Sequence, residues 1–198
     1  MGSSGVSSPP VFVITGPSGA GKGTLIKALL GRLPELEHTI SATTRARRPG
    51  EEDGREYHFL TPADFQQRID AGEFLEWVDY VGNRYGTLRS EIDRIGDRGH
   101  VPVLELETEG AKWVKKRLPT AITIFITAPL EELSRRLRER ATESSGVIGE
   151  RLALAQRQFQ EAGLFDHVVA NDDVEEATDR LEEIVHRALS AAGTMARP

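Results

Sequence analysis

A glycine-rich segment near the N-terminus constrains the fold of this chain more than any other feature. Residues 11–14 are apolar and mostly β-branched, which predicts a buried strand. The pattern Gly16-x-x-x-x-Gly21-Lys22 follows at once, and leucine and isoleucine then recur at helical spacing. Strand, glycine loop and helix in this order predict a phosphate-binding loop, because glycines let backbone N–H groups converge on an anion and the helix directs its positive end there. Lys22 adds a full charge that can reach the outer phosphates of a nucleotide.

The position after this lysine departs from the strict pattern. A serine or threonine is expected there, because its hydroxyl holds Mg²⁺. This chain has Gly23 instead, and the hydroxyl comes one residue later, on Thr24. The departure affects the expected metal site more than the phosphate site. The alternative for the whole segment is an ordinary glycine-rich turn with a solvated lysine.

The remaining sequence alternates apolar strands with helices, which predicts a parallel sheet covered on both faces. Strands are expected at 101–107, 121–127 and 168–170, and helices at 88–97, 109–117, from 129, from about 150 to 161, and at the C-terminal end. Residues 39–95 break this alternation, with short, half-polar strands expected at 38–41, 57–60, 74–81 and 84–87. We expect a small mixed insertion over the carboxyl edge of the sheet, where ligands bind in open α/β folds.

Length, charge and composition exclude several classes of protein. The 198 residues suffice for one substantial domain, and no apolar run approaches the roughly 20 residues of a membrane span. The first ten residues lack the basic and apolar regions of a signal peptide, and the chain has no cysteine. A formal net charge of −6 argues against a nucleic-acid binder. We expect a cytoplasmic protein without nucleic-acid or membrane partners, which meets anionic substrates through local arginines.

Several motifs beyond the glycine loop resemble the guanylate kinase family. They are Gly16-Pro17-Ser18-Gly19-Ala20-Gly21-Lys22, Ser41-Ala42-Thr43-Thr44-Arg45-Ala46-Arg47-Arg48, Tyr57-His58-Phe59, Phe74-Leu75-Glu76-Trp77, Gly82-Asn83-Arg84-Tyr85-Gly86-Thr87 and Val169-Ala170-Asn171-Asp172-Asp173. They occur in order over roughly residues 10–190. The Thr-Thr-Arg-x-x-Arg and Phe-Leu-Glu-Trp stretches are the most specific to this family.

The resemblance implies a fold and a reaction. The fold is a three-layer α/β/α P-loop NTPase with a parallel core sheet (11–38 and 98–190), a mixed α+β GMP-binding insertion (about 39–95) and a helical lid (about 138–150). Residues 1–10 and 191–198 would be tails. The reaction is ATP + GMP → ADP + GDP with Mg²⁺, with dGMP as a further expected acceptor. The protein would be a monomer or a homodimer.

The resemblance also implies the site residues. The catalytic group is Lys22, Arg45, Arg140 and Arg151. The ATP-binding group is Gly16, Pro17, Ser18, Gly19, Ala20, Gly21, Lys22, Gly23, Thr24, Arg136 and Asn171. The GMP-binding group is Ser41, Arg45, Arg48, Tyr57, Glu76, Tyr85, Gly86, Thr87 and Glu107. Thr24 and Glu105 are expected near the metal ion, through water.

The chemistry of these side chains agrees with the resemblance. Guanine presents two adjacent donors, N1–H and the 2-amino group, and one carboxylate such as Glu76 can accept both. Adenine would leave that carboxylate unpaired, which costs several kcal/mol when it is buried. Arginines such as Arg45 and Arg48 suit a phosphate dianion, because each guanidinium is a planar, permanently charged fork. A structural ion pair is the alternative for Glu76, and exposed loop charges are expected for Arg47 and Arg55.

Some positions differ from the family pattern. Gly23 replaces a metal-binding serine, Glu105 and Glu107 stand in place of two aspartates, and Ala141 replaces a lid glycine. Two other functions therefore stay open. One is a catalytically weak guanylate kinase-like binding module, and the other is a P-loop kinase with another phosphorylated acceptor.

Overall fold

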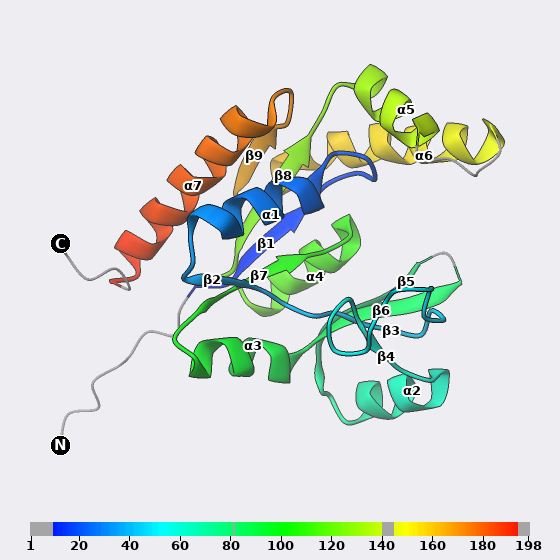
Figure 1. Cartoon of the computed structure of the whole chain (residues 1–198), viewed down its shortest axis with the longest axis vertical. Helices are drawn as coiled ribbons and strands as arrows, with labels where there is room; N and C mark the ends of the chain where they lie inside the picture. Colours follow the sequence, from blue (N-terminus) through cyan, green and yellow to red (C-terminus); the bar gives the residue numbers. More distant parts are fainter. Residues whose placement is uncertain (1–9, 81, 140–144, 194–198) are drawn as a thin grey trace.

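A computed structural model describes residues 10–80, 82–139 and 145–193, which form two sheets with helices around them (Figure 1). The larger sheet has five parallel strands in the order β2-β7-β1-β8-β9. These strands are β1 (Phe12–Thr15), β2 (Leu36–His38), β7 (Val101–Glu105), β8 (Ile122–Thr127) and β9 (His167–Ala170). The expected α/β fold with a parallel core sheet is confirmed.

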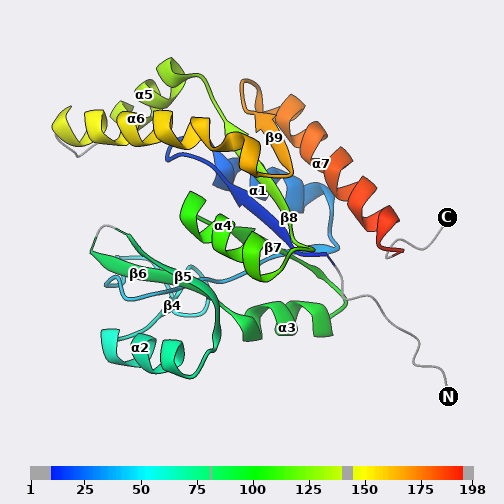
Figure 2. The ribbon, with the colours of Figure 1, turned by 180° about the vertical axis from the view of Figure 1, so that it is seen from behind.

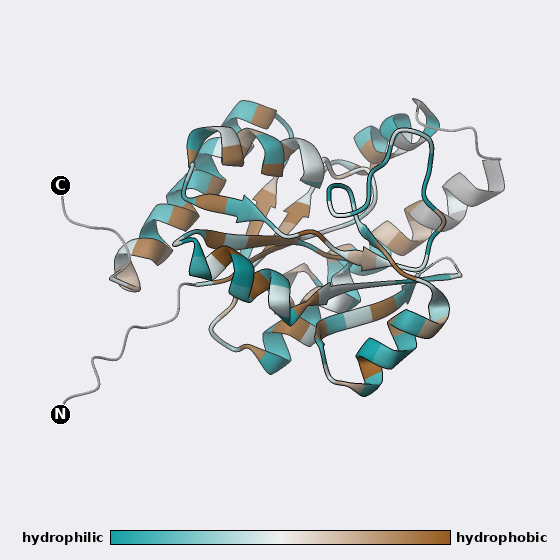
Figure 3. Ribbon diagram, turned by 60° about the horizontal axis from the view of Figure 1, so that its bottom comes forward, coloured by the Kyte–Doolittle hydropathy of each residue, from teal (hydrophilic) through white to brown (hydrophobic). Residues whose placement is uncertain are grey.

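Alternating side chains of β1 supply both faces of this sheet with apolar surface, as the period of a strand requires. Phe12 and Ile14 belong to the core under α1 (Lys22–Arg32) and α7 (Val174–Ala191). Val13 belongs to the core on the other face, under α4 (Thr108–Arg117), with α3 (Arg89–Asp97) beside it. Three layers result, with apolar strands inside and polar helix faces outside (Figure 3).

The smaller sheet has the strand order β4-β3-β6-β5 and lies below the carboxyl end of the core sheet (Figure 2). Its strands are β3 (Ala42–Thr43), β4 (His58–Phe59), β5 (Phe74–Tyr80) and β6 (Asn83–Leu88). Helix α2 (Pro62–Asp70) covers one face, where Phe65 stacks on Phe74 with ring centroids 4.4 Å apart. Helix α4 contacts both β5 and the core strands β1 and β8, so it joins the two sheets.

Local sequence signals place the starts of two helices correctly. The Thr61 hydroxyl accepts from the Asp64 N–H at 3.1 Å at the start of α2. Asp173 accepts from the N–H groups of Glu175 and Glu176 at the start of α7, as expected of an N-cap. The antiparallel pairing of β5 with β6 is also as expected.

Two boundaries expected from the sequence are wrong. The expected strand 38–41 ends at His38, because the chain then leaves the core sheet for the smaller one. The helix expected from about residue 150 begins at Ser145, after α5 (Leu130–Glu139), and is α6 (Ser145–Gln160). No helix among the described residues has both the length and the apolar character needed to cross a membrane.

Candidate active site

The glycine loop between β1 and α1 has a backbone that only glycine adopts without strain. Gly16 has a φ of 136°, and a Cβ there would collide with the backbone carbonyl oxygen of Ile126 on β8. Gly21 has a φ of 87°, and its Cβ would collide with the side-chain amide of Asn171. Both positions therefore combine a left-handed backbone with a close neighbour. The loop is fixed against the end of the core sheet.

Lys22 begins α1 and lies under the glycine loop. The residue is only 9% exposed, and its Nζ donates to the carbonyl oxygens of Gly16 at 2.8 Å and Pro17 at 3.3 Å. It is therefore not a solvated lysine, which was the alternative for this segment. These two hydrogen bonds hold the ammonium group inside the loop, where it can meet an anion.

A cavity of about 610 Å³ opens over the loop and the first turn of α1. Its lining includes Thr24 and Lys27 from α1, and Glu105 and Glu107 from the end of β7. The loop lines it with Ser18, Gly19, Gly21, Lys22 and Gly23. The cavity thus has the Lys22 ammonium group and the loop backbone on one side. The carboxylates of Glu105 and Glu107, at the carboxyl edge of the sheet, also line it.

A second cavity of about 590 Å³ lies between the core sheet and the smaller sheet. Lys22, Glu105 and Glu107 line it as well as the first cavity. Six of the residues expected to bind GMP line it, namely Ser41, Tyr57, Glu76, Tyr85, Gly86 and Glu107. Both volumes fall within the range of small-molecule sites. Two adjoining cavities that meet at a buried lysine can hold two ligands end to end.

Glu76 lies at the buried end of the second cavity. Its residue exposure is 2%, and its Oε1 accepts from the Thr87 hydroxyl at 2.9 Å. A register shift between Phe74 and Glu76 interrupts the pairing of β5 with β6 just before this residue. Burial raises the pKa of Glu76 to about 7, although the hydrogen bonds from Thr87 and the charge of Arg117 oppose this. Thr87 itself is fully buried and, although expected to bind GMP, does not line this cavity.

The arginines expected at the GMP phosphate differ in their surroundings. Both Arg45 guanidinium nitrogens Nη1 and Nη2 bind the Glu51 carboxylate, at 3.0 and 2.7 Å, and the group lies over the ring of Tyr57. Arg48 has an exposed side chain, and its backbone N–H donates to Glu51 at 2.7 Å. Neither arginine lines the second cavity. Arg55, expected as a plain surface charge, is exposed and also lines that cavity.

Two residues expected near the adenine contact the outer side of the glycine loop. The Asn171 Nδ2 donates to the Ala20 carbonyl at 2.7 Å, and Arg136 Nη1 donates to the Gly19 carbonyl at 3.2 Å. The Oδ1 atom of Asn171 is buried and has no hydrogen-bond partner. A ligand with an N–H donor would satisfy it.

The segment expected to form a lid, and the arginines expected in it, are only partly described. Residues 140–144 lie outside the described residues, and they include Arg140 and Ala141. The backbone of Arg151 belongs to α6, but its side chain lies outside what the structure describes. The structure therefore gives no side-chain position for two of the four expected catalytic groups.

Two features of the site were not expected from the sequence. A Cβ on Gly110 of α4 would approach the Glu76 Oε2 to 2.9 Å, so the absence of a side chain there makes room for the carboxylate. Lys27, five residues beyond Lys22 on α1, lines the first cavity. Both depend on tertiary contacts, and only the helical spacing of Lys27 from the glycine loop could have suggested one of them.

The comparison with known families agrees with this geometry. A family model described as guanylate kinase matches residues 8–188. The chain belongs to the guanylate kinase family. The guanylate kinase of Synechococcus elongatus is 48% identical over 176 residues, which are 88% of this chain and 96% of that protein. The guanylate kinase of Rubrobacter xylanophilus is 45% identical over 181 residues, which are 91% of this chain and 95% of that protein.

A solved structure shows the same architecture within the guanylate kinase family. The guanylate kinase of Anaplasma phagocytophilum superimposes with a TM-score of 0.73 at 28% identity, covering 91% of this chain and 86% of that one. The resemblance expected from the motifs is therefore confirmed at the level of the family. Membership makes the protein a nucleoside monophosphate kinase of this family and does not favour the binding module or another acceptor.

Proposed function

We propose that the protein transfers the γ-phosphoryl group of ATP to GMP and, as a second acceptor, dGMP. The observation that carries this proposal is the meeting of the two cavities at Lys22, with Glu76 at the far end of one of them. Residues 39–95 would bind the monophosphate, and residues of about 138–150 would form a lid. We propose a cytoplasmic enzyme that acts as a monomer or a homodimer, with no nucleic-acid or membrane partner.

Glu76 would recognise guanine. Its carboxylate can accept from guanine N1–H and the 2-amino group together, while the Ser41 hydroxyl can donate to O6. Thr87 already donates its hydroxyl proton to Glu76, so it would act on the base through that carboxylate. The ionised carboxylate is costly to bury without partners, and guanine supplies two. Adenine offers no donor at the matching ring nitrogen. Discrimination therefore follows from a carboxylate that the wrong base would leave unpaired.

The GMP phosphate would be held by Arg45, Arg48, Tyr57 and Tyr85. Arg45 and the N–H of Arg48 hold the pKa of Glu51 below its usual value, so this carboxylate stays ionised and fixes the loop. The Arg45 guanidinium also stacks against Tyr57, with 5.3 Å between the guanidinium carbon and the ring centroid. The loop thus has an ordered framework that could present guanidinium groups to a phosphate.

Phosphoryl transfer needs in-line placement and positive charge around the equatorial oxygens, with little covalent help from the protein. Lys22 lies where the two cavities meet and would supply one charge to the transferring group. Arg45, Arg140 and Arg151 would supply others. A GMP phosphate is already ionised, so the protein needs no general base. Water would be excluded by closure of the lid.

The residues at the first cavity fit a magnesium ion held mainly by nucleotide phosphates and water. Mg²⁺ uses few protein ligands in such sites, commonly one or two oxygen donors. Thr24 supplies a hydroxyl and Glu105 a carboxylate in the same cavity, and the described residues contain no cluster of three or more metal-binding side chains. We propose that these two residues hold the ion's water shell. The bound ion would neutralise charge on the phosphates.

Changing Gly23 to serine is expected to alter the magnesium requirement. A Cβ on Gly23 would lie 3.6 Å from the Glu105 Oε2, in ordinary contact, so a serine fits and brings a hydroxyl to the expected ion. We expect Gly23→Ser to lower the Mg²⁺ concentration for half-maximal activity by about threefold, because one added polar contact contributes roughly 0.5–1.5 kcal/mol. Magnesium titrations at saturating ATP and GMP test this. Identical titrations for the two proteins would show that position 23 does not govern metal use.

Changing Gly110 to alanine is expected to weaken GMP binding. The new methyl group would displace the Glu76 carboxylate, and a displacement of about 1 Å in a binding group costs roughly tenfold or more. We expect the KM for GMP to rise about tenfold while the KM for ATP stays within twofold. Gly31→Ala on α1 is the matched control, because a Cβ there meets no atom within 4 Å. Equal KM values for Gly110→Ala and wild type would contradict the placement of the base at Glu76.

The proposed function is tested by an ADP-release assay with GMP, dGMP, AMP, CMP and UMP side by side. We expect ADP release with GMP and dGMP and less than about 1% of that rate with the others, given the cost of an unpaired carboxylate. A folded protein that releases no ADP with any of them would support the binding-module alternative. A faster rate with a different monophosphate would support another acceptor.

A further inference from the structure

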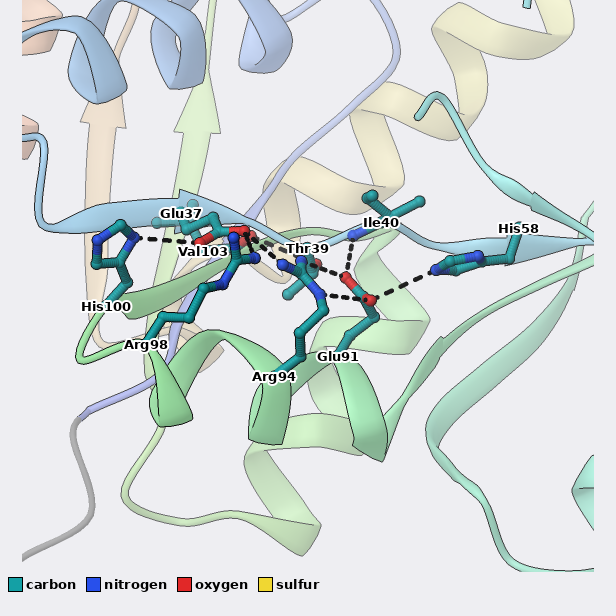
Figure 4. A network of polar contacts seen from close by, with 9 residues as sticks. All are labelled: Glu37, Thr39, Ile40, His58, Glu91, Arg94, Arg98, His100 and Val103. Atoms are coloured by element: carbon teal, nitrogen blue, oxygen red, sulfur yellow. Dashed lines mark hydrogen bonds and ion pairs between the residues drawn. The ribbon is translucent and has the colours of Figure 1, made fainter. Parts of the chain in front are cut away.

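Three consecutive residues, Thr39 to Ser41, carry the chain from the core sheet into the smaller sheet, and each makes a different backbone contact. Figure 4 shows the first two of them. The Thr39 N–H donates to a carbonyl of core strand β7 at 3.0 Å. The Ser41 carbonyl accepts from the His58 N–H of the smaller sheet at 2.9 Å. Between them, the Ile40 N–H donates to the Oε2 of the Glu91 side chain at 3.0 Å. The Glu91 side chain therefore holds the backbone at Ile40, the residue between the two sheets whose N–H pairs with neither sheet.

Glu91 lies on α3, the segment by which the chain returns from the smaller sheet to the core. The residue is 5% exposed, and Arg94 binds both of its carboxylate oxygens, with Nε and Nη2 at 3.0 and 2.9 Å. The His58 Nε2 lies 3.4 Å from its Oε1. Burial acts to raise the pKa of Glu91, but the hydrogen bonds from Arg94, Ile40 and His58 outweigh it, so the pKa lies below its usual value. Glu91 is thus a buried, ionised group. It joins the segment that leaves the core sheet, at Ile40, to α3, the helix that leads back to it.

The same group of contacts continues into the core sheet. Arg94 Nη1 also binds the Glu37 Oε1 of β2 at 2.7 Å. Glu37 in turn contacts Arg98 at 2.6 Å and His100 at 3.1 Å (Figure 4). Glu91 is therefore anchored to the core through Arg94, while its contact to Ile40 reaches the segment that leaves the core.

The crossing matters for the site because Ile40 and Ser41 line the second cavity, together with Glu76. Ser41 also accepts from the His58 N–H of the smaller sheet, and it shares the cavity lining with Lys22 of the core. Resting on the proposed function, we propose that Glu91 is a positioning residue for the monophosphate substrate, which it serves by fixing the backbone of Ile40 and Ser41. Glu91 does not line either cavity, so its effect on GMP acts through that backbone.

A merely structural ion pair on α3 would have other consequences. It would change the free energy of unfolding and would affect both substrates alike. The positioning role affects the monophosphate alone, because none of the hydrogen bonds and ion pairs described for this network reaches the glycine loop. The test therefore compares the KM values of the two substrates and follows the exchange of the Ile40 amide hydrogen.

The experiment uses Glu91→Ala, Glu91→Gln and, as a control, Arg98→Ala, which removes the exposed end of the same network without touching Ile40. We expect Glu91→Ala to raise the KM for GMP about tenfold, because it removes a charged hydrogen-bond acceptor, with the KM for ATP within twofold. Glu91→Gln retains an oxygen for the Ile40 N–H and should raise the KM about threefold. Amide exchange at Ile40 should quicken about tenfold in Glu91→Ala. Arg98→Ala should match wild type in the KM for GMP, the KM for ATP and the exchange rate of the Ile40 amide.

Each other result overturns the inference. An unchanged KM for GMP in Glu91→Ala, an equal rise for both substrates, or an equal effect of Arg98→Ala would assign Glu91 a structural role only. If Glu91→Ala does not fold, a wild-type KM for GMP in Glu91→Gln would also assign Glu91 a structural role only. Wild-type protein that phosphorylates no GMP would instead contradict the proposed function, and the inference would fall with it.

Discussion

The change of Glu76 to glutamine is expected to lower kcat/KM for GMP by about 100-fold or more. The glutamine amide would present an N–H donor where guanine also has a donor, so one hydrogen bond is lost and two donors face each other without an acceptor. The rate with AMP should fall much less, so the preference for GMP narrows. Initial rates with both monophosphates at saturating ATP measure this. Full GMP selectivity in the variant would show that another group recognises the base.

The same change is expected to stabilise the free protein at alkaline pH relative to wild type. The pKa of Glu76 rises from 4.5 to about 7 on folding, so between these values the folded protein binds more protons than the unfolded chain. The free energy of unfolding therefore falls as pH rises through this window, by about 3 kcal/mol in all. Glutamine does not titrate and abolishes this contribution.

Urea unfolding at pH 5 and pH 8 tests this effect on stability. We expect the wild-type free energy of unfolding to fall more steeply between the two values than that of Glu76→Gln, by roughly 2–3 kcal/mol. The comparison of slopes cancels the titration of all other groups. Parallel changes in the two proteins would mean that Glu76 is ionised in the folded protein at both pH values.

The change of Lys22 to methionine is expected to lower kcat by about 1,000-fold. Lys22 is the buried cation shared by the two cavities, so it is placed to stabilise charge on the transferring group. Methionine retains the apolar stem and the packing under the loop while removing the charge. Pre-steady-state measurement of GDP formation at saturating substrates isolates this step.

Two controls separate catalysis from folding and binding. Lys116→Met changes an exposed lysine of α4 and should leave kcat unchanged. GMP affinity of Lys22→Met, measured by calorimetry, should stay within about threefold, since the base is recognised at the far end of the cavity. A Lys22→Met protein with kcat near the wild-type value would remove Lys22 from the catalytic group.

Features set by local sequence were predictable. The glycine loop, the apolar strand before it and the caps at Thr61 and Asp173 each depend on residues close together in the chain. The pairing of β5 with β6 was also predictable, because a glycine turn separates two strand-like segments. These features position the phosphate-binding end of the site and the edge that carries Glu76.

Features set by distant contacts were not predictable. The segment 38–41 has a strand-like composition, but Ile40 binds Glu91 instead of a neighbouring strand. The start of α6 at Ser145 falls in a polar stretch with two glycines, which gives no local helix signal. The fit of Glu76 against Gly110 joins residues on different elements. No periodicity in the sequence reports such contacts, so the buried end of the site required the structure.

A crystal structure with bound GMP would locate the base relative to Glu76. We expect the guanine edge against Glu76, with N1 and the 2-amino nitrogen each about 3 Å from a carboxylate oxygen, and the phosphate directed toward Lys22. Clear density for the purine anywhere else, with Glu76 still bound only to Thr87, would contradict it.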